Sequence, residues 1–172
     1  MKAQAEDIGS ALAARQAELE ASQVAARACR RCVEAGHISE ARPVFAGDAS
    51  CRVMLIGQAP GVRSRDAGWP FAGPSGRVLA SWFDQAGFPV GYFPGRVYCT
   101  SVTRCFPGPA RGGGDRPPSL SERQLCRPWL DAELRLVRPS VVLLVGRLAV
   151  ADLLPKLAGR PLVELVGMSV ED

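Results

Sequence analysis

Cysteine spacing is the first feature of this sequence that suggests chemistry. The chain has six cysteines, and its polar, acidic first ten residues do not resemble a secretory signal, so a disulfide framework is not expected. Cys29 and Cys32 form a C-x-x-C pair, and 20 residues separate Cys105 from Cys126. Two close thiols combined with two distant ones suit a structural zinc ion or an iron–sulfur cluster. The remaining two cysteines lie in apolar, strand-like runs and are expected in the core.

A glycine-rich segment, Gly57-Gln-Ala-Pro-Gly61, directly follows one of these apolar runs. Backbone N–H groups placed after a strand can face an anion or the polar edge of a heterocycle, and glycine allows close approach. A tight turn without a ligand is the alternative interpretation. The next segment, Gly68-Trp-Pro-Phe-Ala-Gly73, adds two aromatic rings, which either stack on a base or form a small core that fixes the loop.

Residues 105–119 form a Gly/Pro-rich stretch that is long for a loop in a compact domain. Loops of this kind are usually functional or disordered, so the stretch is a place to expect a ligand. Three arginines lie in it or next to it, and their guanidinium groups suit phosphate contacts: Arg104, Arg111 and Arg116. A solvated basic loop is the plainer alternative.

Three apolar runs alternate with helical patterns and position these features. The runs span residues 51–57, 97–102 and 140–145, and the helical patterns span 3–28, 75–86, 121–137 and 147–157. The βαβαβα order predicts an α/β fold with a central, mostly parallel sheet and helices on both faces. Ligands of such sheets bind at the carboxyl ends of the strands. The tail, residues 159–172, shows no obvious closing strand.

The chain has 172 residues, 47% hydrophobic and 22% charged, which fits one domain, residues 1–172, and excludes collagen, coiled coil and wholesale disorder. No apolar run reaches the ~18 residues that cross a bilayer, so no membrane partner is expected and a cytoplasmic location is the default. The net charge is +4, and Lys2 and Lys156 are the only lysines. The positive charge is therefore almost wholly guanidinium, which permits binding to a polyanion.

Several of these blocks together resemble the iron–sulfur uracil-DNA glycosylases, often called family four. The resemblance rests on Gly57-Gln-Ala-Pro-Gly61, Gly68-Trp-Pro-Phe-Ala-Gly73, Ser75-Gly76, Tyr98-Cys-Thr-Ser-Val-Thr-Arg-Cys105, Asp115-Arg-Pro117 and Cys126-Arg-Pro128. The matched blocks follow a helical lead-in over residues 1–28. The resemblance implies a three-layer αβα sandwich and removal of uracil from DNA, by a protein expected to be a monomer.

The same resemblance sorts the cysteines. Cys29, Cys32, Cys105 and Cys126 correspond to the four ligands of a 4Fe–4S cluster, whereas Cys51 and Cys99 fall at apolar strand positions. A zinc ion is the alternative for the four thiolates. In either case the metal would fasten the N-terminal helix to the loop 106–119 and support a surface that faces DNA.

The resemblance also implies a base pocket. Phe71 takes the place of the family's base-stacking phenylalanine, and Ser101 stands where the family commonly has an asparagine that binds the uracil edge. The loop amides suit the pocket wall and the positioning of water. The implied substrate-binding residues are Gly57, Gln58, Ala59, Pro60, Gly61, Phe71 and Ser101; the implied DNA-binding residues are Ser75, Gly76, Arg104, Arg111 and Arg116; the candidate catalytic residues are Gln58 and Asp66.

The sequence departs from the family pattern at two places. Gln58 replaces the usual acidic residue, and an amide cannot act as a general base although it can orient water. The later H-P-S-like motif, whose histidine stabilises the leaving uracil, is absent, and the only histidine is His37. A truncated chain with a missing C-terminal strand is therefore expected, with a natural paralogue that lacks the motif as the alternative, and at best weak activity is expected in either case. The alternatives are a glycosylase for another deaminated base and a metal-stabilised DNA-binding module.

Overall fold

The computed structural model describes residues 2–171 and has the predicted α/β architecture. Three parallel strands form one sheet in the order β2-β1-β3. The strands are β1 (Val53–Gly57), β2 (Val97–Ser101) and β3 (Val141–Leu144). Because all three run in the same direction, their carboxyl ends meet at one edge of the sheet, where ligands of such folds bind.

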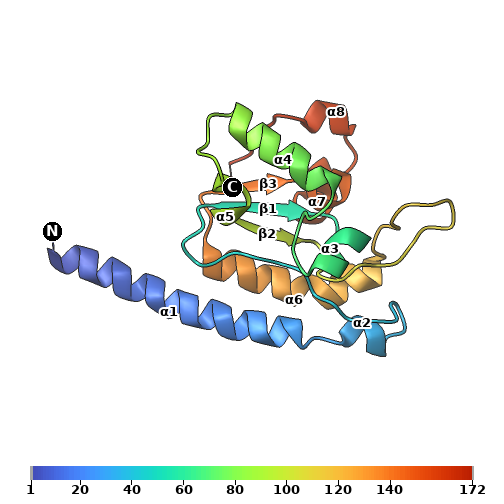
Figure 1. The fold of residues 1–172 in the computed structure, drawn as a ribbon, viewed down its shortest axis with the longest axis horizontal. Coiled ribbons are helices and arrows are strands. Elements are labelled where there is room, and N and C mark those ends of the chain that lie inside the picture. Colours follow the sequence, from blue (N-terminus) through green and yellow to red (C-terminus); the bar gives the residue numbers. More distant parts are fainter. Residues whose placement is uncertain (1, 172) are drawn as a thin grey trace.

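The helices of the described residues flank this sheet. They are α1 (Lys2–Arg27), α2 (Arg31–Glu34), α3 (Val62–Ala67), α4 (Pro74–Gln85), α5 (Tyr92–Gly95), α6 (Leu120–Val137), α7 (Arg147–Leu153) and α8 (Leu162–Leu165), with a short 3-10 helix at Pro155–Leu157. In Figure 1, α1 and α6 lie below the sheet, α4 lies above it, and α5 lies at the end of the sheet where the strands begin. The predicted three-layer arrangement is confirmed.

The sequence of the central strand β1 is apolar throughout because both faces of the strand are covered by helices. Met54 and Ile56 pack on the face covered by α1 and α6, whereas Val53 and Leu55 pack on the face covered by α4. Both faces of the strand are buried, so no polar alternation is possible. Fully burying each such side chain contributes about 1.5–3 kcal/mol.

Helix α6 begins where the sequence predicts, because its first turn is capped. The hydroxyl of Ser119 accepts the Glu122 N–H at 3.2 Å, and the Glu122 carboxylate accepts the Ser119 N–H at 2.7 Å. This reciprocal capping box satisfies two N–H groups that the helix itself leaves unpaired. The box fixes the point at which the long loop 105–119 ends.

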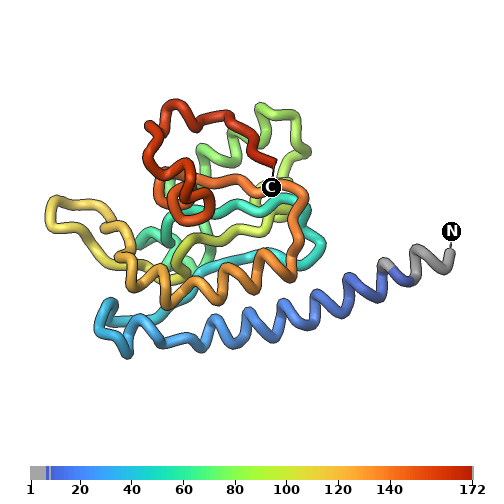
Figure 2. Tube along the Cα trace, turned by 180° about the vertical axis from the view of Figure 1, so that it is seen from behind, coloured from blue at the N-terminus to red at the C-terminus, as the bar shows by residue number. Residues whose placement is uncertain are grey.

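Two predicted elements differ from the structure. The stretch between the apolar run that ends at residue 57 and the helical pattern that begins at residue 75, for which the sequence indicates no helix, contains the short helix α3. The last predicted helix ends at Leu153, because Pro155 has no N–H to continue it, and a 3-10 turn follows. Figure 2 shows α1 lying along α6, and the loop 105–119, in yellow, projecting at the end of the molecule away from the amino terminus.

The third strand lies at the edge of the sheet and is partly exposed, with Val141 at 49% of its maximum exposure. Residues 159–171 contribute the short helix α8 and no further strand to the described part of the sheet. Within residues 2–171, none of the helices has the length and apolar character that crossing a membrane would require.

Candidate functional site

A pocket opens at the carboxyl ends of β1 and β2. Its walls are formed by Val44, Ala59, Pro60, Gly61, Ser64, Pro70, Phe71, Ser75 and Ser101. The walls are apolar rings and methyl groups, three hydroxyls and backbone, with no titratable side chain. Such a surface suits the flat face of an uncharged heterocycle, with the hydroxyls available for its polar edge.

The Phe71 ring lies against the end of β1. A Cβ added to Gly57 would lie 3.3 Å from Cζ of Phe71 and 3.4 Å from Oγ of Ser101. A side chain at Gly57 would make tight contact with the ring and ordinary contact with the hydroxyl, so the glycine lets both groups approach the strand end. The structure brings together the aromatic ring, the strand-end hydroxyl and the glycine loop, three features that are up to 44 residues apart in the chain.

The backbone of Phe71 adopts an uncommon conformation that aims this ring. Its φ angle is 54°, in the left-handed region that a bulky residue rarely adopts. A Cβ at Gly76 would lie only 1.7 Å from the Phe71 carbonyl oxygen, so glycine is required at that position. The next N–H, of Ala72, is held by the Ser64 hydroxyl at 3.2 Å. Strained backbone of this kind persists where the surrounding structure imposes it, and it gathers at functional sites.

Most of the predicted substrate-binding residues meet at this pocket: Ala59, Pro60, Gly61, Phe71 and Ser101 line it, as does Ser75, and Gly57 lies directly beneath the ring. Gln58 is half-buried, lies outside the lining, and accepts the Thr103 N–H at 3.3 Å through its carbonyl oxygen. Gly76 is buried against Phe71, so the prediction that it contacts DNA is wrong, and its role is to let the chain pass close to that residue.

The candidate catalytic residue Asp66 is not brought to the pocket. It lies near the end of α3, its side chain is 56% exposed, and it pairs with Arg65 at 2.7 Å. A different carboxylate, that of Asp115, lies against Gly61 of the pocket wall. Sequence reasoning placed Asp115 only within a matched block, because nothing in the local pattern shows that the long loop folds back over the glycine loop.

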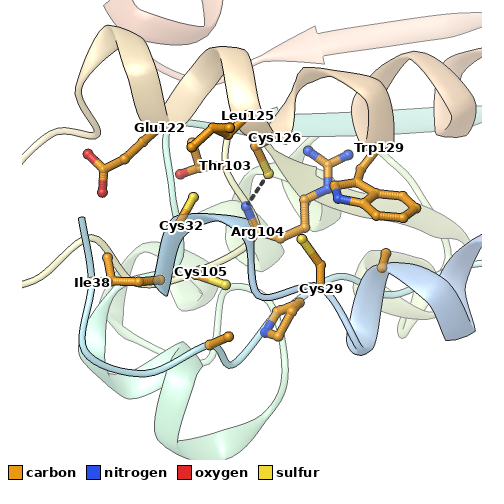
Figure 3. Close-up of a pocket in the computed structure, with 13 residues that line it drawn as sticks. Cys29, Cys32, Ile38, Thr103, Arg104, Cys105, Glu122, Leu125, Cys126 and Trp129 are labelled. Atoms are coloured by element: carbon orange, nitrogen blue, oxygen red, sulfur yellow. Dashed lines mark hydrogen bonds between the residues drawn. The ribbon is translucent and has the colours of Figure 1, made fainter. Parts of the chain in front are cut away.

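The four cysteines expected as metal ligands line a second pocket, between α1, α2 and α6. Figure 3 shows the sulfur atoms of Cys29, Cys32, Cys105 and Cys126 around one space. Thr103, Arg104, Glu122 and Trp129 complete much of its wall. The chain brings the C-x-x-C pair together with two distant thiols, as the spacing indicates. Cys51 and Cys99 are buried in the core, as predicted.

Burial controls the state of these thiols. It raises the pKa of Cys32 to about 11 and that of Cys105 to about 12, and it raises the pKa of Cys126 as well. One N–H donor already points at this group, because the backbone N–H of Arg104 lies 3.3 Å from the Cys126 sulfur (Figure 3). A bound metal would replace the protons and remove the energetic cost of buried thiolates.

The prediction that Arg104 contacts phosphate is wrong, because its side chain is buried. Its side chain is only 2% exposed, and its guanidinium pairs with the buried carboxylate of Glu133 on α6. It also donates to the carbonyl oxygen of Ser101 at 2.7 Å. The side chain is directed inward to the Glu133 carboxylate, so Arg104 joins the end of β2 to α6.

The two arginines of the long loop have different environments. Arg116 donates twice to Glu122, at 2.7 and 2.8 Å, and once to the His37 carbonyl oxygen at 3.1 Å. These bonds lower the pKa of Glu122 even though burial alone would raise it. Arg116 therefore anchors the loop to α6. Arg111 is exposed near the tip and makes no ion pair within the described residues.

The sequence matches known proteins over most of this region. Residues 44–168 match the Uracil DNA glycosylase superfamily, so the chain belongs to that superfamily. It is 30% identical over 114 residues to a Type-4 uracil-DNA glycosylase of Pyrobaculum aerophilum, covering 66% of this chain and 53% of that protein. A second Type-4 uracil-DNA glycosylase, from Sulfurisphaera tokodaii, is 28% identical, covering 59% and 42%. One from Thermotoga maritima is 25% identical, covering 72% and 64%. The chain thus spans about half the length of the curated relatives it matches.

Proposed function

We propose that this chain is a DNA glycosylase that hydrolyses the N-glycosidic bond of uracil in DNA. One observation carries the proposal: the Phe71 ring and the Ser101 hydroxyl meet over Gly57 at the carboxyl end of the sheet. A base inside a duplex cannot reach such a pocket, so the nucleotide must be flipped out of the stack. The membership of the superfamily and the names of the relatives support this substrate.

Different pocket residues contact different parts of the base. Phe71 offers its face for stacking, which is worth about 1–3 kcal/mol per base. Ser101 offers one hydroxyl, which can donate or accept at the uracil edge, where an amide would do both. Ala59, Pro60 and Gly61 also line the pocket. These contacts position the base while its bond to the sugar breaks and negative charge develops on the ring.

DNA is the proposed partner, and Arg111 is the residue of the long loop best placed for a phosphate. It lies on a projecting, glycine-rich hairpin whose tip contains Gly112, Gly113 and Gly114. The N–H of Ala110 bonds the Gly114 carbonyl oxygen at 2.9 Å, which closes the hairpin below the tip. An exposed arginine on such a loop can contact the DNA backbone without reading its sequence.

We further propose that Cys29, Cys32, Cys105 and Cys126 hold a 4Fe–4S cluster. The donor set fits, because four thiols and a sulfur-directed N–H surround one pocket. Four thiols also suit a structural zinc ion, and the resemblance to the iron–sulfur uracil-DNA glycosylases is what favours the cluster. A bound cluster would supply metal–thiolate bonds that join α1 and α2 to α6 and take no part in base removal.

The test is base release from synthetic DNA by the purified, metal-loaded chain. Single-stranded and duplex oligonucleotides would carry uracil, hypoxanthine or thymine at one position, and abasic sites would be revealed by alkaline cleavage. Cleavage at uracil supports the proposal. Cleavage at hypoxanthine alone would instead assign the pocket to another deaminated base. Binding without cleavage of any substrate would indicate a DNA-binding module.

A further inference from the structure

We propose that Asp115 is the catalytic carboxylate of this site; the inference rests on the glycosylase function proposed above. Asp115 belongs to the long loop after β2, 54 positions from Gly61 in the sequence. In the fold the two residues touch, since a Cβ added to Gly61 would lie 2.8 Å from Oδ2 of Asp115. The loop thus places a carboxylate against Gly61, one of the lining residues of a pocket that has no charged side chain among them.

The base of the hairpin fixes the position of Asp115. Its backbone bridges to Pro109 in antiparallel fashion, and the next N–H, of Arg116, bonds the Gly108 carbonyl oxygen at 3.0 Å. Arg116 is in turn fixed to α6 by its two bonds to Glu122. The carboxylate is therefore attached to a supported part of the loop, below the glycine tip.

The carboxylate is also free to act. Asp115 is exposed, and among the described residues no ion pair or hydrogen bond to its side chain occurs. The other carboxylates of the neighbourhood are already used: Asp66 pairs with Arg65, and Glu122 pairs with Arg116. An unpaired carboxylate in contact with a pocket wall is available for a cation that develops there.

The geometry also indicates which part of the nucleotide Asp115 faces. Among the lining residues Ser101 is buried, Gly61 is half-buried and Ser75 is exposed, so a base bonded to Ser101 leaves its sugar on the side of Gly61, where Asp115 lies. In the reaction the C1′–N1 bond breaks, and its electron pair leaves with the uracil ring. A water oxygen forms the new bond to C1′, and the Asp115 carboxylate accepts the proton of that water. Uracil then takes a proton from solvent, and the carboxylate returns its proton to solvent.

The experiment measures binding to two uncleavable DNA probes as well as uracil release. One probe carries a cationic pyrrolidine in place of the deoxyribose, which mimics the charged sugar, and the other carries a neutral tetrahydrofuran. Fluorescence anisotropy of the full metal-loaded chain should show a preference for the cationic probe of roughly tenfold, as expected for one nearby charge. D115N should lose most of this preference and release uracil at least tenfold more slowly.

Two further variants sharpen the test. D84N, an exposed carboxylate on α4 outside the pocket, should keep both the preference and the rate. Gly61→Ala, at a φ of −78° that alanine accepts, should push the carboxylate away and weaken the preference without altering its charge. If D115N keeps the preference for the cationic probe, Asp115 is not the catalytic carboxylate, although the glycosylase function stands. The same holds if D66N loses that preference and D115N does not. Failure of the wild-type chain to bind any DNA would overturn the glycosylase function and this inference with it.

Discussion

Arg104 donates a hydrogen bond from its guanidinium to the carbonyl oxygen of Ser101 at 2.7 Å, while its own backbone N–H points to the sulfur of Cys126 at 3.3 Å. One buried residue therefore contacts both the strand end that forms the base pocket and the cysteine pocket. Glu133 on α6 neutralises the guanidinium. The two candidate sites are consequently built on the same segment, residues 101–105, and a change in one position of that segment affects both.

Removing one member of this buried pair should destabilise the fold severely. We expect Arg104→Met to reduce the free energy of unfolding by about 3–5 kcal/mol, because Glu133 is left as an uncompensated buried charge. Urea denaturation followed by circular dichroism measures the loss. The matched double variant, Arg104→Met with Glu133→Leu, should regain at least half of it. A single variant that loses less than 1 kcal/mol would show that the pair does not support the fold.

Phe71→Ala should weaken the binding of uracil-containing DNA more than that of undamaged DNA. The loss of base stacking should cost about 1–3 kcal/mol, or roughly 5- to 150-fold in affinity, because the base loses its aromatic partner. Trp69→Ala is the control, since that ring belongs to the same loop but lies outside the pocket lining. Equal losses for both DNAs would assign Phe71 a purely structural role.

Gly76→Ala should disturb the same ring without touching it. The new methyl carbon would lie 1.7 Å from the Phe71 carbonyl oxygen, which is backbone and cannot rotate away. We expect a loss of about 1–3 kcal/mol in unfolding free energy, typical of overpacking. Gly112→Ala provides the comparison, because nothing lies within 4 Å of its added carbon. Similar stabilities for the two variants would contradict the close approach.

The helices, the strands and the burial of Cys51 and Cys99 could be predicted from the sequence because they follow from local pattern. Apolar runs bounded by glycine indicate buried strands, and Ser119 followed by Glu122 indicates a helix start. The grouping of Phe71 and Ser101 could be predicted from a resemblance that covers several blocks together. Local pattern therefore predicts the fold class, and the resemblance predicts most of the pocket lining.

The remaining site residues depend on side-chain direction, which sequence pattern does not determine. In the sequence Arg104 resembles a phosphate ligand beside a basic loop, yet its guanidinium is directed inward because the buried carboxylate of Glu133 on α6 faces it. Gly76 looks like part of a DNA-contacting turn, yet tight packing against Phe71 decides its role. The position of Asp115 depends on how a 15-residue loop folds back, from Cys105 to Ser119, and this requires tertiary structure.

Metal content should depend on four cysteines and not on the other two. Cys29→Ala and Cys126→Ala should abolish iron in anaerobically purified protein, because each removes a ligand of the proposed cluster. Cys51→Ala and Cys99→Ala are matched controls of the same chemistry, and both are buried in the core. Iron and zinc would be measured together by mass spectrometry. Stoichiometric zinc with no iron would contradict the cluster assignment, and iron loss in a control would contradict the ligand set.

Arg111→Ala should reduce the salt dependence of DNA binding. Removing one phosphate contact should lower the slope of log affinity against log salt by about 0.7–0.9, equally for all sequences. Arg135→Ala, at an exposed site near the end of α6, changes the net charge identically and serves as the control. If the slope is unaltered in Arg111→Ala, or changes equally in both variants, the hairpin does not contact DNA.

We expect the pocket beside Phe71 to bind a uracil flipped out of DNA and its N-glycosidic bond to be hydrolysed there. Single-turnover release of uracil, with metal-loaded protein in excess over a labelled oligonucleotide, tests it most directly because even slow hydrolysis is then detected. We expect free uracil and an abasic site in equal amounts from the uracil strand, none from the matched thymine strand, and a large loss of rate in Phe71→Ala. Two results would contradict this function: protein that binds the oligonucleotide but releases no uracil, and a rate of uracil release that is the same in Phe71→Ala as in the wild-type chain.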